Sequence, residues 1–275
     1  IITGSRSEFS LMKNLIIELK KIKNLQTKLI VTGSHLSNEY GYTYKEIQNE
    51  KINIFKKINI LGNTNKIKNT STLSSISTGI EKFKNFFLKT KPNLVCIPCD
   101  RYEMLGPAIS AFFLNIPIAH FFGGETTHGS QDETIRHILT KISLYHFVTH
   151  KTHMKRVIQM GESSKNVFLV GNMTIDNIRN TNLLKLNQIK KRIKFYENKK
   201  NILVTFHPIT NVPSETKKQF KNLLKALSNF KSENIIFTKP NSDEGSFYIT
   251  QMIKIFIKRN KNANLYDSLG HKLYY

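Results

Sequence analysis

The chain has 275 residues, 39% of them hydrophobic, which is enough for two α/β domains that each bury a core. No run of about 18 apolar residues occurs, so the sequence predicts no membrane-spanning helix and no membrane partner. The net charge is +23 and the pI is about 9.9. Such values are typical of proteins that bind a polyanion such as nucleic acid.

The positive charge comes mainly from lysine, because only seven of the 42 basic residues are arginine. Lysine is spread along the chain beside abundant Asn and Ile, a mixture that an AT-rich genome encodes without selection. We therefore expect no nucleic-acid partner, although a phosphate-rich small substrate would benefit from the positive field. Nucleic-acid binding, kept as an alternative, would need exposed stacking aromatics, and the aromatics here lie in core-like runs.

Short apolar runs alternate with segments of helical period, the pattern of a doubly wound parallel sheet covered on both faces. Ile1–Thr3 reads as the end of a strand, and we interpret the chain as lacking a few residues at its front. Further strands are predicted at 28–32, 93–97, 117–122, 145–149, 167–170, 202–206, 235–238 and 263–266. Helical periodicity marks 9–22, 73–87, 223–227 and 252–256.

A Lys- and Asn-rich stretch at 181–200 predicts a domain junction. The fold class is then α/β with two Rossmann-like, doubly wound parallel-sheet domains. Residues 1–180 would form the first domain, and residues 181–275 a second, incomplete one.

Two glycine turns follow the first two predicted strands, at 3–8 and 32–36. A glycine turn that opens a helix can offer backbone N–H groups to an anion. It can equally be an ordinary βα turn with a capping serine.

Cys96 and Cys99 have C-x-x-C spacing, which suits a redox pair or half of a zinc site. No second cysteine pair exists to complete a zinc site, and Cys96 lies inside an apolar run. We favour two packed thiols in a reducing cytoplasm.

Acidic residues follow the next two strands, where ligands of parallel sheets bind. Asp100 and Glu103 follow the run at 93–97, and Glu125 follows two glycines after the run at 117–122. Asp132 and Arg136 are four apart on the following helix and can pair. Helix capping and a surface ion pair are the alternative explanation.

Two loops of the second domain also follow predicted strands, as the acidic residues do in the first domain. His207 precedes a proline at the end of a predicted strand, and residues 239–245 follow the next strand. Each loop can face an anion or can be a plain capped turn.

These segments together resemble the hydrolysing UDP-N-acetylglucosamine 2-epimerases of the sialic-acid and legionaminic-acid pathways. The matching stretches are in family order and lie at 4–6, 31–37, 41–47, 100–105, 123–125, 132–137, 207–210 and 240–245. The resemblance implies two facing Rossmann-like domains, the arrangement called GT-B. It also implies a UDP-sugar substrate, no cofactor, no metal, a cytoplasmic location and, as in many relatives, a homodimer.

The implied reaction has two steps. A base takes the C2 proton while UDP leaves C1, and water then adds to the 2-acetamidoglycal with a proton delivered to the other face of C2. Carboxylates suit this acid–base work. By motif position, the resemblance gives catalytic roles to Asp100, Glu125, Asp132 and His207, the last one beside the departing UDP.

The resemblance also implies substrate contacts for five residues: Arg6, Glu103, Arg136, His137 and Asn241. Arg6 would lie near the phosphates, which suit a planar, permanently charged group. The sugar, either UDP-N-acetylglucosamine or UDP-linked diacetylbacillosamine, stays open.

Three departures from the family pattern affect these expectations. Phe122 stands where many relatives carry Glu or His, and Cys99 stands where a small residue such as Gly is usual. The glycine- and serine-rich UDP-binding segment that follows in the family lies beyond Tyr275. A glycosyltransferase of the same architecture is the main rival, since fold alone does not separate the two.

Overall fold

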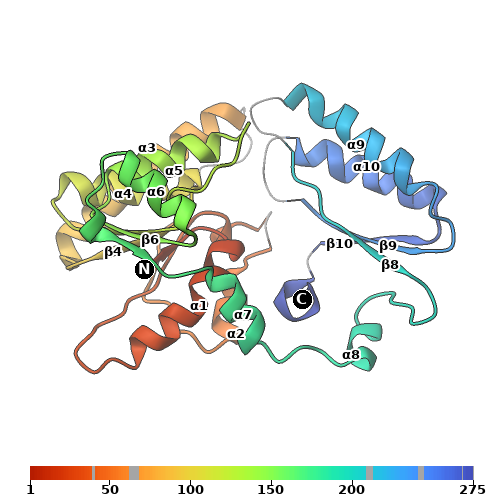
Figure 1. The fold of residues 1–275 in the computed structure, drawn as a ribbon, viewed down its shortest axis with the longest axis horizontal. Helices are drawn as coiled ribbons and strands as arrows, with labels where there is room; N and C mark the ends of the chain where they lie inside the picture. The colour runs from red at the N-terminus through yellow and green to blue at the C-terminus, as the bar shows by residue number, and fades with distance from the viewer. Residues whose placement is uncertain (39–40, 62–67, 209–212, 241–244, 268, 275) are drawn as a thin grey trace. The chain divides into compact units, whose positions relative to one another are not determined.

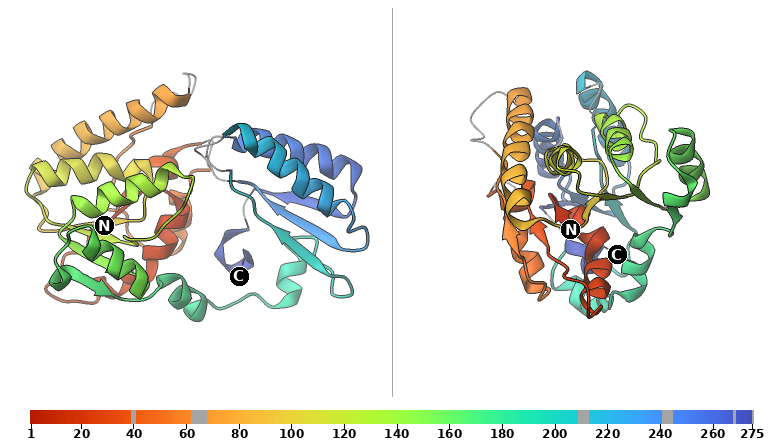
Figure 2. Two further views of the ribbon diagram at one scale, coloured as in Figure 1. Left: turned by 45° about the horizontal axis from the view of Figure 1, so that its top comes forward. Right: turned by 90° about the vertical axis from the view of Figure 1, so that its left-hand side faces the viewer.

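A computed structural model describes residues 1–38, 41–61, 68–208, 213–240, 245–267 and 269–274. The chain forms two compact units (Figures 1 and 2). Unit 1 comprises residues 1–128 and 132–179, and unit 2 comprises residues 129–131 and 180–275.

Unit 1 is built on parallel strands in two hydrogen-bonded sheets, with orders β1-β2-β3 and β4-β5-β6-β7, and β1 lies against β4. The strand order therefore reverses between β1 and β4, the position at which doubly wound sheets bind ligands. The strands are β1 Ile2–Thr3, β2 Ile30–Val31, β3 Lys56–Lys57, β4 Val95–Pro98, β5 Ile118–Phe121, β6 Tyr145–Val148 and β7 Val167–Leu169.

Helices cover both faces of these sheets (Figure 2). Val95 and Ile97 belong to one buried cluster, while Cys96 between them belongs to another with Met12 of the first helix. Burial on both sides explains why the strands read as continuous apolar runs. The helices are α1 Arg6–Lys20, α2 Tyr44–Asn49, α3 Lys68–Thr90, α4 Leu105–Phe113, α5 Gln131–Lys141, α6 Lys151–Gln159 and α7 Met173–Asn180, with short 3₁₀ turns at Gly33–Leu36, Tyr102–Met104 and Ser164–Asn166.

Unit 2 has a parallel sheet of order β10-β9-β8, with β8 Asn201–Val204, β9 Asn234–Thr238 and β10 Ala263–Tyr266. Helices α9 Pro213–Leu227 and α10 Ser246–Arg259 lie on the same face of it (Figure 1). Their apolar sides meet the sheet in one core that contains Phe220, Phe237 and Ile253. The short helices α8 Leu186–Lys190 and α11 Gly270–Tyr274 complete the unit.

The predicted α/β class with parallel sheets is confirmed. Each apolar run predicted as a strand contains one, whereas β3 was missed because both of its residues, Lys56 and Lys57, are exposed. No helix within the described ranges is long and apolar enough to cross a bilayer.

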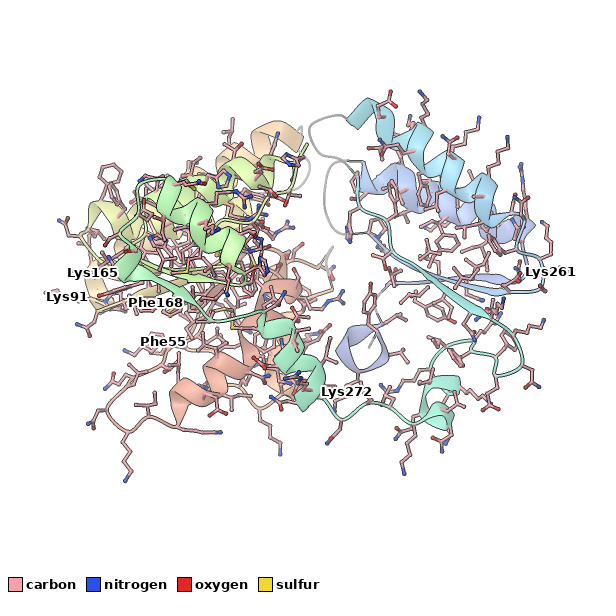
Figure 3. All side chains as sticks on the ribbon, in the orientation of Figure 1. Phe55, Lys91, Lys165, Phe168, Lys261 and Lys272 are labelled. Atoms are coloured by element: carbon pink, nitrogen blue, oxygen red, sulfur yellow. The ribbon has the colours of Figure 1, made fainter. Side chains whose placement is uncertain are left out.

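Lysine side chains lie mainly on the outside of each unit. Lys91, Lys165, Lys261 and Lys272 are exposed, and Figure 3 shows each one at the periphery of its own unit.

Candidate active site

Polar side chains follow three neighbouring strands of unit 1 at their carboxyl ends. Asp100 comes after β4, Glu125 after β5 and Thr149 after β6. Since β4, β5 and β6 are adjacent and parallel, these ends lie along one edge of the sheet.

Arg136 of α5 ties the first two strand ends together. Its guanidinium donates to the carboxylate of Asp100, to the carbonyl of Glu125 at 3.0 Å and to the hydroxyl of Thr127 at 3.0 Å. Its side chain is only 4% exposed, so the ion pair with Asp100 is largely shielded from water. The planar, permanently charged fork can hold all three groups in one geometry.

Asp132 lies on the same helix, one turn before Arg136, and is partly buried. Residues four apart lie on one face of a helix, so Asp132 and Arg136 share a face of α5. The ion pair of Arg136 with Asp100 comes from tertiary structure and was not anticipated in the sequence analysis.

The loop that contains Gly123, Gly124 and Glu125, called the glycine loop below, packs closely against α6. Gly124 has φ +77°, and a Cβ there would lie 2.4 Å from the carbonyl oxygen of His153. Arg156 of α6 donates to the carbonyl of Gly124. Only glycine allows this approach and this backbone conformation together.

The side chain of Glu125 is also held. The hydroxyl of Thr149 donates to Oε1 of Glu125 at 2.9 Å, and Nδ1 of His153 lies 3.9 Å from the same oxygen. The Glu125 side chain remains about one third exposed, at 33%, so it can still meet a ligand.

At the β1–α1 turn, the structure favours the second of the two interpretations, a capped βα turn. The N–H groups of Gly4 and Ser5 donate to Oε2 of Glu8, at 2.6 and 2.9 Å. Glu8 is 1% exposed, and burial, followed by repulsion from Glu103, raises its pKa to about 8. An internal acid thus occupies the donors that the sequence suggested for a phosphate.

Glu103 lies next to this turn, 1% exposed, with Oε2 3.2 Å from Nε of Arg101. Its Cβ is 3.1 Å from the position that a Cβ on Gly4 would take. The substrate contact expected for Glu103 stays a prediction, as does that of Arg6, which begins α1 and is partly buried.

His137 is 31% exposed, with Nε2 4.0 Å from Glu133, and desolvation lowers its pKa. In unit 2, His207 is exposed just after β8. Asn241 lies outside the described residues. The roles expected for these three residues stay predictions.

The two cysteines are free. Burial raises the pKa of both thiols, opposite to what a redox cysteine requires. Cys99 adopts φ +60°, and its carbonyl lies 2.7 Å from Nε2 of buried His120. Burial lowers the pKa of His120 to about 4, so that ring is neutral and joins the β4 and β5 ends.

No group of three or more His, Cys, Asp or Glu side chains within the described ranges is arranged to hold a metal ion.

The model of the family described as UDP-N-acetylglucosamine 2-epimerase matches residues 17–275. The chain belongs to this family.

Curated relatives agree with this assignment. The chain is 40% identical over its whole length to a GDP/UDP-N,N'-diacetylbacillosamine 2-epimerase (hydrolyzing) of Campylobacter jejuni, of which it covers 71%. It is 35% identical, over 94% of its length, to the polysialic acid biosynthesis protein P7 of Escherichia coli, of which it covers 66%. The chain thus spans roughly two thirds of these relatives.

A solved structure supports the fold. The UDP-GlcNAc 2-epimerase of Neisseria meningitidis, bound to UDP-GlcNAc, superposes with a TM-score of 0.82 at 17% identity. The match covers 99% of this chain and 73% of that one.

Phe122, the departure from the family pattern noted above, is an apolar core residue here. It is 6% exposed, has φ +69° and packs in the cluster that contains Phe121. Its backbone N–H donates to the carbonyl of Phe147 at 3.0 Å. In this epimerase-family chain, the carboxylate that the loop carries is that of Glu125, three residues after Phe122.

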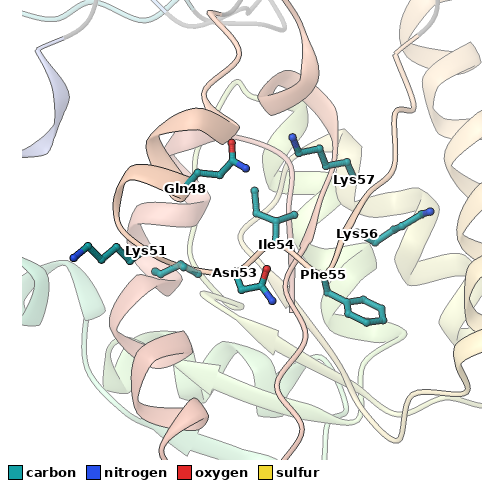
Figure 4. A pocket seen from close by; sticks show the side chains of 8 residues that line it. Gln48, Lys51, Asn53, Ile54, Phe55, Lys56 and Lys57 are labelled. Carbon is teal, nitrogen blue, oxygen red and sulfur yellow. The ribbon is translucent and has the colours of Figure 1, made fainter.

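A separate hollow lies beside the segment that leads into β3 (Figure 4). Its lining runs from the end of α2 into β3 and includes none of Asp100, Glu125 and Asp132. Its lining includes Lys57, whose ammonium sits 3.3 Å from the ring centroid of Tyr44. The full lining is Gln48, Lys51, Ile52, Asn53, Ile54, Phe55, Lys56 and Lys57.

Proposed function

We propose that the protein is a hydrolysing UDP-sugar 2-epimerase that releases UDP and a free N-acetyl sugar inverted at C2. The observation that carries the proposal is the bond network of Arg136. That network fixes the carboxylate of Asp100 and the backbone of Glu125 at neighbouring strand ends within a family of 2-epimerases.

The proposed chemistry is an anti elimination followed by hydration. One carboxylate accepts the proton of C2 as the bond from C1 to the UDP oxygen breaks, which leaves a 2-acetamidoglycal. Water then adds at C1 while a carboxyl group protonates C2 on the opposite face. Asp100, Glu125 and Asp132 are the proposed acid–base groups, because proton transfer at carbon needs positioned groups on both faces.

The leaving group has its own proposed contacts. His207 would hold the diphosphate as it departs, and Arg6 would lie near the phosphates, with Arg136, Glu103, His137 and Asn241 as further substrate contacts. We propose a homodimer and no cofactor, as the resemblance implies.

For the sugar, two relatives point the same way. The Campylobacter jejuni relative, and one from Legionella pneumophila at 33% identity, are both named for N,N'-diacetylbacillosamine substrates. We propose a UDP-linked N-acetylated hexosamine of this kind, with UDP-N-acetylglucosamine as the alternative.

The test is to incubate the protein separately with the two UDP-sugars and to analyse the products by NMR and anion-exchange chromatography. The proposal predicts UDP and a free sugar with the manno configuration at C2. Transfer of the intact sugar to an added acceptor, without release of a C2-inverted sugar, would support the glycosyltransferase reading instead.

A further inference from the structure

We propose that Thr149 and His153 are positioning residues that form a proton relay behind Glu125. The inference rests on the proposed function, because a carboxyl group that gives up a proton during turnover has to regain one. It adds two residues that the motif comparison did not single out.

A continuous chain of short contacts carries the proposal. The Thr149 hydroxyl is 2.9 Å from Oε1 of Glu125 and 2.8 Å from Nδ1 of His153. The imidazole lies within 3.9 Å of the same carboxylate oxygen. A hydroxyl has one proton to donate and lone pairs to accept, so it can join an acid to a ring nitrogen.

The protonation pattern follows from these contacts. When Glu125 is ionised, Thr149 donates to it, and Nδ1 of His153 has to donate to Thr149. The neutral ring then carries its proton on Nδ1. When Glu125 is protonated, both bonds reverse, and Nδ1 becomes an acceptor.

One proton can therefore pass along the chain. An imidazolium at His153 gives its Nδ1 proton to the oxygen of Thr149, while the proton of that hydroxyl moves to Oε1 of Glu125. An imidazolium and a carboxylate become a neutral ring and a carboxylic acid, so charge and protons balance. The His153 side chain is 24% exposed, so its outer nitrogen can exchange protons with water.

The backbone around the relay is clamped. Arg156 holds the Gly124 carbonyl, and Gly124 rests against the carbonyl of His153. The acid and the ring therefore belong to two segments locked together at the first turn of α6, and the three polar groups keep their spacing without a ligand.

Burial and the charges around His153 determine the pKa of its ring. Desolvation lowers its pKa, Glu125 opposes that shift, and Arg156, His150 and Arg136 add to it. These groups come from the glycine loop, from the N-cap and the last turn of α6, and from α5.

His150 provides a matched control. Its ring lies 5.8 Å from that of His153, centroid to centroid, on the same helix start, but its Nδ1 pairs with Thr152. A His150→Asn change keeps a good helix-capping residue at that position.

The experiment has two readouts on the intact protein. Long-range ¹H–¹⁵N NMR of the histidine rings, assigned with His153→Gln, reads the tautomer without substrate. We expect Nδ1–H in the neutral ring of the wild type and of Thr149→Ser, and a shift toward Nε2–H in Thr149→Val. An Nε2–H ring in the wild type, or a tautomer unaffected by Thr149→Val, would overturn the relay.

The second readout is kcat against pH. We expect Thr149→Val and His153→Gln to lower kcat by up to about 10²-fold with little change in KM. They should also alter the acid side of the profile, whereas Thr149→Ser follows the wild type and His150→Asn keeps the wild-type kcat, because His150 lies outside the chain of hydrogen bonds. Profiles that are alike in His153→Gln and His150→Asn would contradict the relay. If the wild type released no UDP, the proposed function alone would fail, because the ring tautomer is measured without turnover.

Discussion

The strand ends of unit 1 hold their polar side chains in an internal network, whereas those of unit 2 present His207 to solvent. In unit 1, Arg136 and Thr149 fix Asp100 and Glu125 at neighbouring ends. In unit 2, a polar contact near the β8 end joins the hydroxyls of Thr205 and Thr238 at 2.7 Å, and His207 is exposed. Asp100 and Glu125, two of the three groups proposed for proton transfer, are thus held in place without a ligand, whereas the group proposed for the leaving UDP is exposed.

The largest expected effect is a loss of kcat, and it should distinguish the strand ends of unit 1 from those of unit 2. Asp100→Asn and Glu125→Gln should each lower kcat by about 10²- to 10⁴-fold, the usual contribution of a positioned acid or base. His207→Gln should mainly raise KM, because a contact to the diphosphate is made before and during the reaction. Steady-state kinetics of UDP release measures kcat and KM. If His207→Gln lost more kcat than Asp100→Asn and Glu125→Gln, the distinction between the two units would be wrong.

The next effect concerns stability. Arg136→Met removes the cation from a buried ion pair and should lower the free energy of unfolding by about 3–5 kcal/mol. Lys218→Met is the control in unit 2, because Lys218 pairs with Glu215 at 3.8 Å on an exposed helix face. That change should stay within about 0.5 kcal/mol. Urea unfolding monitored by circular dichroism compares them, and equal losses would refute the role given to Arg136.

A smaller effect tests the contact between the glycine loop and α6. Gly124→Ala should cost about 3 kcal/mol, since the new Cβ meets backbone and φ is positive. Gly171→Ala has the same kind of backbone, with φ +80° and open space around the Cβ position. It should cost only about 1 kcal/mol. The same unfolding assay measures both losses. If the Gly124 variant were as stable as the Gly171 variant, the glycine loop would accommodate the new Cβ at little cost.

The smallest effect per unit of change is a pH slope from Glu8. Its pKa is raised to about 8 in the folded chain, so the folded state binds a proton that the unfolded chain releases near its ordinary pKa of 4.5. Stability from this group is therefore lost as pH rises between those values, by about 1.4 kcal/mol per pH unit at most.

Glu8→Gln keeps an acceptor for Gly4 and Ser5 and should remove that slope. Because His35 and His120 have pKa values lowered to about 4, they add stability as pH rises toward 6.5 in both proteins. The difference between wild type and variant therefore isolates Glu8. If the free energies of unfolding of wild type and Glu8→Gln differed by a constant amount from pH 5 to pH 8, Glu8 would be ionised in the folded chain.

Sequence patterns were sufficient for the strands that are buried on both faces. The run at 93–97 predicted β4 because the side chains of Val95, Cys96 and Ile97 are all buried, whereas β3 is two exposed lysines and gives no apolar signal. The acids at 100 and 125 could be placed at strand ends by the rule for parallel sheets.

Contacts between distant residues could not be read in the same way. Arg136 and Asp100 are 36 residues apart, and Thr149 looks like a plain strand end until β5 and β6 are paired. Glu8 did have a local signal, because Ser5-x-x-Glu8 is the spacing of a capping box. That spacing explains why the N–H groups of the turn have an internal acceptor.

The most direct test of proton chemistry at the sugar is turnover in heavy water, with the released sugar analysed by NMR. The account predicts one deuterium at C2 of a free, C2-inverted N-acetyl sugar, formed together with UDP and strongly slowed in Asp100→Asn. Release of UDP with the original hydrogen retained at C2 would contradict it.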